Sequence, residues 1–310
     1  MTPFLVDVHS HVNFAAFKED GDLVLRRALE KNIWVVNVGS QIDTSRRAVE
    51  IAEKHPWGVY AIVGLHPIHL EEMDVDEEEH HFTTRAEQFD VGIYKALAAH
   101  PKVVALGECG LDYYRLDANI REEERESTRI GNAPQPPLMV RGGGDGGVMA
   151  IKERQRETLI HHIALANELK KPLMIHIRAA KDDPDGAYRD LAEIIRTYPI
   201  NASGDVHCFS GSRETAQALL DLGLYLSFTG IVTFKNAHEA RDLVRYVPLK
   251  SLLVETDAPY LAPDPYRGKR NEPSYVEFIA RKVAEVKGVD FKKVAEVTTE
   301  NAMRLFKGLR

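Results

Sequence analysis

The chain has 310 residues, of which 44 % are hydrophobic, and a formal net charge of −7. This composition is normal for a globular protein with a sizeable core, and its acidic balance argues against a protein that coats nucleic acid through a global positive field. Only two cysteines and no apolar run of bilayer length are present, which excludes a disulfide scaffold and a membrane-spanning helix and leads us to expect a soluble, cytoplasmic protein.

Eight short apolar runs alternate with longer amphipathic segments along the chain. The runs are almost continuously hydrophobic, which is typical of strands buried on both faces of a parallel sheet. They begin at Phe4, Ile33, Val59, Val103, Leu173, Gly204, Leu224 and Leu252. The helical patterns cover 22–31, 43–55, 87–100, 152–170, 186–198, 213–222 and 237–246, with two or three closing helices from residue 274 onward. This alternation predicts an α/β protein, a (β/α)8 TIM barrel in a single domain over 1–310, with a doubly wound open sheet as the alternative.

Two stretches do not follow the alternation. The acidic stretch "EEMDVDEEEHH" at 71–81 is expected to be a solvated loop. Residues 117–149 begin with a charge run and continue with "GNAPQPPLMVRGGGDGGV", whose proline and glycine content argues against a helix or a core strand. We expect 117–149 to be a mobile insertion after the fourth strand, with room for a short helix at its start.

Histidines and acids stand at the ends of most of the predicted strands. They are His9 and His11, His66, Glu108, His176, His207 and Asp257. In a barrel these strand ends meet at one mouth, where catalytic groups lie. Residues two apart on a strand share a face, so His9 and His11 can reach one ion, and imidazoles and carboxylates are the usual ligands of Zn²⁺ or Mn²⁺. Taken singly, Glu108 and Asp257 are equally well explained as helix-capping acids, whereas the HxH pair directly after the first strand favours ligands. The joint placement of these residues at strand ends favours a metal site.

The two cysteines, Cys109 and Cys208, each neighbour a candidate ligand. Adjacent residues on a strand point to opposite faces. If Glu108 and His207 face the site, both thiols face the helices. We therefore do not expect a thiol nucleophile.

Several of these motifs together resemble the TatD-type metal-dependent DNases of the amidohydrolase superfamily. They are "DVHSHVNF", "GLHP", "GECGLDYY", "KPLMIHIR", "VHCFSGS", "FTGIVTFKNA", "VETDAPYLAPDPYRGKRNEPSYV" and "TTENAMRLF". The resemblance runs from the first strand to the last helix and lapses only over about 117–149. It implies a site for two divalent ions, Mg²⁺, Mn²⁺ or Zn²⁺. One ion is held by His9, His11, Glu108 and Asp257, and Glu108 bridges to a second ion held by His176 and His207.

The mechanism that the resemblance implies is attack of a metal-activated water on a phosphodiester. Asp257 accepts the proton of that water, and Glu108 fixes the spacing of the ions, so both are assigned as catalytic. Substrate contacts are predicted from groups near the mouth, with a solvated loop charge as the alternative reading of Lys235. They are His66, Arg178, Lys235, Arg270 and Asn271.

The predicted function is a 3'-5' exonuclease that cleaves single-stranded DNA from its ends. Its partner is DNA rather than a membrane, and it is expected to be a monomer or a weak homo-oligomer. The first alternative is a hydrolase of another ester or amide, such as an aminoacyl-tRNA ester or a lactone. The second alternative is a non-catalytic nucleic-acid-binding protein, which would show a broken ligand set or an extended basic stripe; neither is visible in the sequence.

Overall fold

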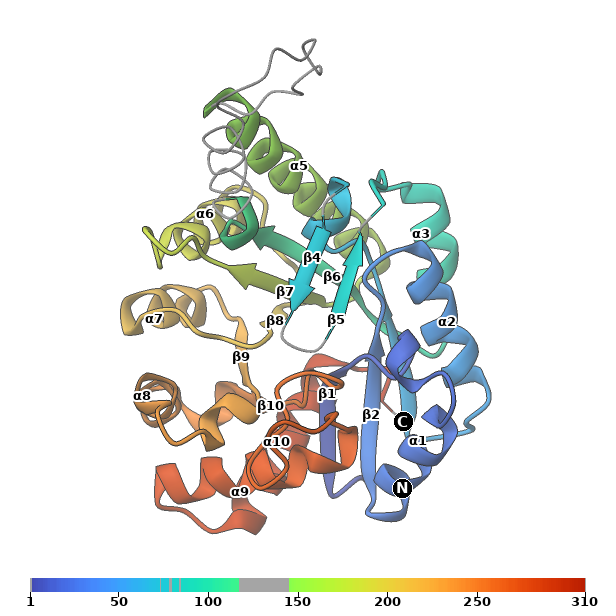
Figure 1. Ribbon diagram of the computed structural model, residues 1–310, viewed down its shortest axis with the longest axis vertical. Coiled ribbons are helices and arrows are strands. Elements are labelled where there is room, and N and C mark those ends of the chain that lie inside the picture. The colour runs from blue at the N-terminus through green and yellow to red at the C-terminus, as the bar shows by residue number, and fades with distance from the viewer. Residues whose placement is uncertain (1, 73, 78–79, 84, 117–144, 310) are drawn as a thin grey trace, which may run out of the picture.

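A computed structural model describes residues 2–72, 74–77, 80–83, 85–116 and 145–309 (Figure 1). Eight parallel strands are hydrogen-bonded in the order β1-β2-β3-β6-β7-β8-β9-β10. Their bounds are β1 Leu5–Ser10, β2 Ile33–Val38, β3 Val59–Val63, β6 Val103–Asp112, β7 Leu173–Arg178, β8 Gly204–Val206, β9 Tyr225–Phe228 and β10 Leu252–Val254. Each of the eight predicted runs forms one of these strands, and the prediction of a (β/α)8 TIM barrel is confirmed.

The barrel closes between its first and last strands. Ser10 pairs with Ala258 as an isolated parallel bridge. The backbone nitrogen of His11 donates to the Ala258 carbonyl at 2.7 Å, and the nitrogen of Asp257 donates to the His9 carbonyl at 2.9 Å. Two candidate ligand segments far apart in the sequence are thereby joined through their backbones.

The helices lie around the outside of the barrel in Figure 1. They are α1 Gly21–Glu30, α2 Ile42–Glu53, α3 Val91–Ala98, α5 Asp145–Leu169, α6 Gly186–Thr197, α7 Arg213–Asp221, α8 His238–Tyr246, α9 Val276–Lys287 and α10 Phe291–Leu305. Short 3₁₀ turns are η1 Ala15–Phe17, η2 Pro67–Leu70, η3 Gly230–Thr233, η4 Leu249–Ser251 and η5 Pro273–Tyr275. All of the predicted helical segments are helical. Among the helices that the structure describes, none is long and apolar enough to cross a membrane.

Local sequence sets where several of the helices begin and end. The side chains of Asp90 and Ser212 cap α3 and α7, accepting hydrogen bonds from the backbone nitrogens of Ile93 at 2.9 Å and Thr215 at 3.2 Å. These bonds satisfy donors that have no partner within the helix. Gly288 ends α9 with φ +65, a left-handed conformation that glycine adopts without steric cost.

Two apolar layers line the two sides of the sheet. Residues such as Val35 and Ala61 pack with α1 and α2 in the outer layer. Alternate residues such as Val8 and Val36 point the other way and pack with Phe306, at the end of α10, inside the barrel. Helix α10 thus closes the end of the barrel opposite to the strand ends that carry the candidate ligands.

The prediction for the acidic stretch 71–81 is wrong. Its backbone forms two antiparallel strands, β4 Asp74–Glu77 and β5 His80–Thr83, in which Val75 is opposite Phe82. The charge density of this stretch indicated a loop, but antiparallel strands do not need to be buried on both faces. Pairing between distant backbone groups decided the structure here.

The predicted insertion does follow the fourth barrel strand, β6, but its end was placed too late. Residues Asp145–Met149 already belong to α5. Two glycines at 146 and 147 weaken helix propensity, and the strong helical pattern that follows outweighs them. Residues 117–144 are outside the described part of the chain, and so are the predictions of mobility and of a helix made for them.

His162 of α5 positions one of the strand-end segments. Its Nε2 accepts a hydrogen bond from the backbone nitrogen of Leu65 at 3.2 Å, and its Nδ1 donates to the Thr158 carbonyl at 2.8 Å. The imidazole is fully buried, and burial lowers its pKa to about 4. A neutral histidine therefore holds the segment that leads into His66.

Replacing His162 by Gln is expected to flatten the dependence of stability on pH. The pKa of His162 falls from 6.5 to about 4 on folding. Its contribution to the free energy of unfolding is therefore fully present above pH 6.5 and is lost as pH falls through 4. By pH 5 the loss amounts to about 2 kcal/mol. Urea unfolding at pH 7 and pH 5 measures it. His161→Gln, at the exposed neighbouring position, is the control; equal losses in wild type, H161Q and H162Q would contradict a neutral, buried His162.

Candidate metal centre

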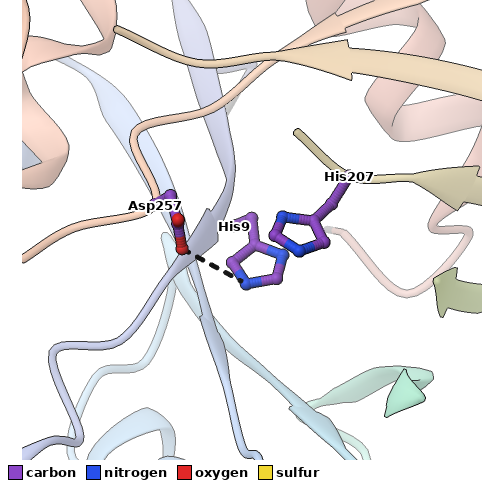
Figure 2. Close-up of side chains that lie close together, drawn as sticks. All are labelled: His9, His207 and Asp257. Atoms are coloured by element: carbon purple, nitrogen blue, oxygen red, sulfur yellow. Dashed lines mark ion pairs between the residues drawn. The ribbon is translucent and has the colours of Figure 1, made fainter. Parts of the chain in front are cut away.

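The six predicted ligands meet at one end of the barrel. His9 Nε2 lies 3.1 Å from His11 Nε2 and 3.8 Å from Asp257 Oδ1. On the other side, the rings of His9 and His207 are stacked with centroids 4.0 Å apart. Figure 2 shows His9, His207 and Asp257 converging from β1, from the segment after β8 and from the segment after β10. His176 Nδ1 completes the cluster at 3.1 Å from His207 Nε2.

Glu108 lies at the centre of the cluster, and its two oxygens face different groups. Oε2 is 3.5 Å from His9 Nε2 and 3.8 Å from His11 Nε2. Oε1 is 2.9 Å from His207 Nε2 and 3.0 Å from His176 Nδ1. One carboxylate therefore stands between two sets of imidazoles, which is the arrangement expected of a bridging ligand.

A local irregularity of β1 directs His9 into the site. The register of β1 against β2 shifts between Asp7 and Ser10. Val8 already faces the barrel interior, yet the next residue, His9, reaches the interior site as well. A bulge of this kind re-aims a side chain. The two imidazoles meet as the HxH pattern predicts, but through a shifted register rather than a regular strand.

Two glycines allow β6 and β7 to approach closely beside Glu108. A Cβ atom on Gly107, which has φ +133, would lie 2.3 Å from the carbonyl oxygen of Met174. A Cβ atom on Gly110, with φ +151, would lie 1.9 Å from the carbonyl oxygen of His176. Only glycine fits either position. The "GECG" sequence therefore brings Glu108 next to His176 through its backbone.

The charges of the cluster are strongly coupled. Burial alone would raise the pKa of Glu108, but His66, His207 and His9 outweigh it and hold that pKa well below its usual range. Burial would lower the pKa of His207, but Glu108 and Glu255 raise it well above normal. Glu108 is thus ionised and needs positive charge around it.

Three buried acids behind the ligands were not predicted. Asp112 Oδ2 lies 3.3 Å from His176 Nε2, and Glu255 Oε1 lies 3.4 Å from His207 Nδ1. Burial and the neighbouring Glu255 raise the pKa of Asp205 well above normal. Each stands two or four residues from a predicted ligand, in "GECGLD", "GDVHC" and "VETD". The alternation of a strand was the signal that would have found them.

The donor set fits divalent metal ions. Groups of three possible ligand atoms lie within 4.8 Å of one another in His9, His11 and Glu108, and again in His66, Glu108 and His176. Imidazole nitrogens that face one another at 3.1 Å cannot both carry protons toward each other. His11 Nδ1 lies 2.8 Å from the Val38 carbonyl and donates to it, which leaves Nε2 free to ligate. A cation between these nitrogens satisfies them.

Of the predicted substrate contacts, two lie at or beside the cluster. His66 Nε2 is 3.4 Å from Glu108 Oε1. Arg178, at the end of β7, places its guanidinium carbon 3.9 Å from the centroid of the Tyr114 ring. Both are oriented by groups around the mouth, and their roles toward substrate stay predictions.

The other three predicted substrate contacts are placed differently. Lys235 is exposed beyond η3 and lines a cleft between α8 and α9. Arg270 is paired with Asp20, with Nη1–Oδ1 at 2.9 Å. The amide of Asn271 is fully buried, and its nitrogen donates to the carbonyls of Thr256 at 2.8 Å and Tyr260 at 2.6 Å. Asn271 thus holds the segment around Asp257; any substrate contact of these three residues stays a prediction.

The fold and the site together define a metal-dependent hydrolase built on a (β/α)8 barrel. The family model described as TatD related DNase matches residues 6–307. YabD of Bacillus subtilis (strain 168), named an uncharacterized metal-dependent hydrolase, is 37 % identical over 98 % of this chain and 99 % of its own length. The chain belongs to the TatD-related DNase family.

Two further relatives extend the comparison. A protein of Erwinia tasmaniensis named 3'-5' ssDNA/RNA exonuclease TatD is 28 % identical, covering 97 % of this chain and 99 % of its own. The crystal structure of YJJV, a TatD homologue from Escherichia coli K12, superposes with a TM-score of 0.75 at 26 % identity, over 99 % of each chain. These similarities cover essentially the whole chain.

The two cysteines lie in different surroundings: Cys109 belongs to the outer apolar layer, and Cys208 follows β8 and is partly exposed. Cys109 is fully buried in the outer apolar layer, and burial raises the pKa of its thiol. The Sγ of Cys208 lies 3.7 Å from Thr229 Oγ1, and burial raises its pKa to about 12. Neither thiol is suited to act as a nucleophile.

Both thiols are expected to resist alkylation in the folded protein. At pH 8 the raised pKa of Cys208 slows its reaction with iodoacetamide by about 10³-fold relative to a free cysteine, because only the thiolate reacts. Mass spectrometry of protein alkylated before and after unfolding in urea measures this. Rapid labelling of Cys208 in the native protein would restore the thiol as a catalytic candidate.

Proposed function

We propose that this protein is a two-metal hydrolase that cleaves phosphodiester bonds at the ends of single-stranded DNA, with 3'-5' polarity. The observation that carries the proposal is the position of Glu108, whose two oxygens face separate sets of imidazoles. Two adjacent ions held this way are the arrangement used to displace a group at phosphorus. The exonuclease activity in the name of the Erwinia tasmaniensis relative supports a nucleic-acid substrate.

The ligands divide between the two ions as follows. His9, His11 and Asp257 would hold one ion, His176 and His207 the other, and Glu108 both. When bound, the ions supply Lewis acidity toward water and toward the phosphate oxygens. Within the first set, His11 is fixed from behind, because its Nδ1 donates to the Val38 carbonyl.

Asp257 has the position and charge of a proton acceptor. Its side chain is 15 % exposed, whereas that of Glu108 is 4 % exposed. Burial would raise the pKa of Asp257, but His11 and His9 outweigh it and lower that pKa, so the carboxylate is ionised. Its φ of +56 is unusual for a residue other than glycine, and such strain is common where a side chain is held for chemistry.

Cations at the mouth can neutralise a substrate phosphate without a basic surface. Arg178 is partly exposed and is held over the Tyr114 ring. His66 is next to Glu108 and can contact a phosphate oxygen or a water on the ions. This local arrangement is compatible with a net charge of −7. Cytoplasmic location and a monomeric or weakly oligomeric state remain predictions.

Glu108→Gln is expected to lower the rate of DNA hydrolysis by more than about 100-fold, comparable to removing a major transition-state contact. The isosteric amide keeps the shape but removes the charge that holds both ions. Wild-type protein stripped of metal by a chelator should regain activity when Mg²⁺, Mn²⁺ or Zn²⁺ is added. Inductively coupled plasma mass spectrometry should find fewer ions bound per chain in the variant than in wild type.

Glu50→Gln, on the exposed face of α2, is the matched control for loss of a carboxylate. Single-stranded DNA labelled at either end, an aminoacyl ester and a lactone panel are assayed in parallel. Full nuclease activity and metal content in E108Q would refute the bridging role. Hydrolysis of the lactones or aminoacyl ester in place of DNA would favour the alternative substrates.

Glu255→Gln is expected to weaken metal binding by about 10- to 100-fold, the usual cost of losing a carboxylate behind a ligand histidine. Glu255 is fully buried and faces His207 Nδ1, and it accepts hydrogen bonds from the Cys208 nitrogen at 2.7 Å and Ser227 Oγ at 2.8 Å. Competition with a chromophoric chelator measures the affinity. Ser227→Ala removes only the hydroxyl contact and is the control; if E255Q binds metal as wild type does, Glu255 does not position His207.

A further inference from the structure

A positively charged cleft lies outside the metal centre, between α8, α9 and the segment after η3. Its volume is about 390 Å³, and its lining holds four cationic side chains and one carboxylate, that of Glu285. The cations are Lys235, Arg241, Arg245 and Lys282. In a chain with a net charge of −7, such a local excess of positive charge marks a candidate site for an anionic ligand.

Only part of this positive charge is compensated. Arg245 pairs with Asp242, and Lys282 Nζ lies 2.7 Å from Glu285 Oε2. Arg241 donates instead to backbone carbonyls, including that of Phe234 at 2.6 Å. Within the described residues, Arg241 and Lys235 have no ion pair with a carboxylate. The cleft therefore keeps a net positive charge. Arg241 also fixes the shape of the cleft, because it donates to backbone carbonyls of the lining.

The cleft begins beside the segment that carries Asp257. The backbone nitrogen of Asp264 donates to Thr233 Oγ1 at 2.9 Å, which ties the segment after β10 to η3. Arg267 of the same segment places its guanidinium carbon 3.6 Å from the centroid of the Phe234 ring. Lys235 and Arg267 thus stand near the mouth of the barrel.

From there the cleft follows the two helices away from the mouth. Helices α8 and α9 lie side by side in Figure 1, and Lys287 Nζ at the end of α9 donates to the Val247 carbonyl after α8 at 2.7 Å. Arg245 and Lys282 stand in the later turns of these helices. The cations therefore form a path that leads from the mouth along the outside of the barrel.

We propose that this cleft binds the phosphate backbone of a single-stranded nucleic acid, several nucleotides from the end that is being cleaved. The inference rests on the proposed function and adds to it the direction in which the strand leaves the site. A strand end held only at the metal centre would dissociate after each cleavage. Cations spaced along a path hold successive phosphates without regard to sequence. The carboxylates of Glu285 and Asp242, which pair with two of the cations, keep the attraction weak enough for the strand to advance.

The test variant replaces Lys235, Arg245 and Lys282 by Gln and leaves Arg241 in place. The matched control replaces Lys54, Lys250 and Lys293, three exposed lysines at the other end of the barrel. Lys293 pairs with Glu296 at i,i+3 as Lys282 does with Glu285, so each variant leaves one such glutamate unpaired. The cleft variant also leaves Asp242 without Arg245. The two variants have the same net charge.

Binding of a fluorescein-labelled 12-nucleotide DNA strand is measured by anisotropy in chelator, over a range of salt concentrations. We expect the cleft variant to bind the strand about tenfold more weakly at low salt. Each lost phosphate contact lowers the magnitude of the slope of log K against log salt by about 0.7, so the loss of three contacts should lower it by about 2. Lys235→Gln alone should lose about 0.7 from that slope. The control variant should retain the slope of wild type.

Equal affinity and slope in the cleft and control variants would overturn the proposal. Because binding is measured in chelator, it is separate from catalysis. Hydrolysis of bis(p-nitrophenyl) phosphate by metal-loaded wild type tests the phosphodiesterase activity on its own. Absence of that activity would refute the proposed function, while the salt dependence of DNA binding still decides whether the cleft takes a strand.

Discussion

The structure is organised around one buried carboxylate, that of Glu108. An ionised carboxylate is costly to bury unless opposite charge and hydrogen bonds surround it. Here imidazoles from the first, third, fifth and sixth strands of the barrel contact its two oxygens. That requirement explains why backbone irregularities gather near it. Glycines let β6 and β7 approach closely, and a register shift in β1 directs His9 inward.

The interior of the barrel divides along its axis. The end closed by α10 is apolar, with Phe306 and Leu305 packed against side chains of the strands. The other end carries charged groups, and behind them a layer of buried acids that includes Asp205 and Glu255. Glu255 faces His207 Nδ1 at 3.4 Å, and Asp112 faces His176 Nε2 at 3.3 Å, so these two acids are placed to orient the histidines. In a barrel enzyme the apolar end stabilises the fold, and the polar mouth carries the functional groups.

The segment after β10 links the centre to the outer surface. It carries Asp257, it is held by the buried amide of Asn271, and through Asp264 it is joined to η3. Arg270 anchors its later part to Asp20 after the first strand. Residues that a sequence reading assigns to substrate therefore also hold the loop in place. One ordered segment connects the candidate ligands to the cleft between α8 and α9.

Much of this protein was predictable because it is encoded by local periodicity. Each apolar run forms a strand and each amphipathic segment a helix. The rule that barrel strands end at one mouth is enough to predict that His9, Glu108, His176 and Asp257 lie together. The pairing of β4 with β5 was missed, because antiparallel pairing joins backbone groups across a turn and leaves little trace in composition. The helical start of α5 was missed because the glycines there are outweighed by the helix that follows.

By itself the sequence determined the order of strands and helices, the fold class and which side chains stand at strand ends, since these depend on neighbours along the chain. Only the tertiary structure decided which oxygen of Glu108 faces which imidazole, that Asp112 and Glu255 lie behind the histidines, and that Arg27 pairs with Glu272 across 245 positions. Contacts of this kind depend on strand register and on the packing of whole elements, and neither is written in any short stretch of the chain.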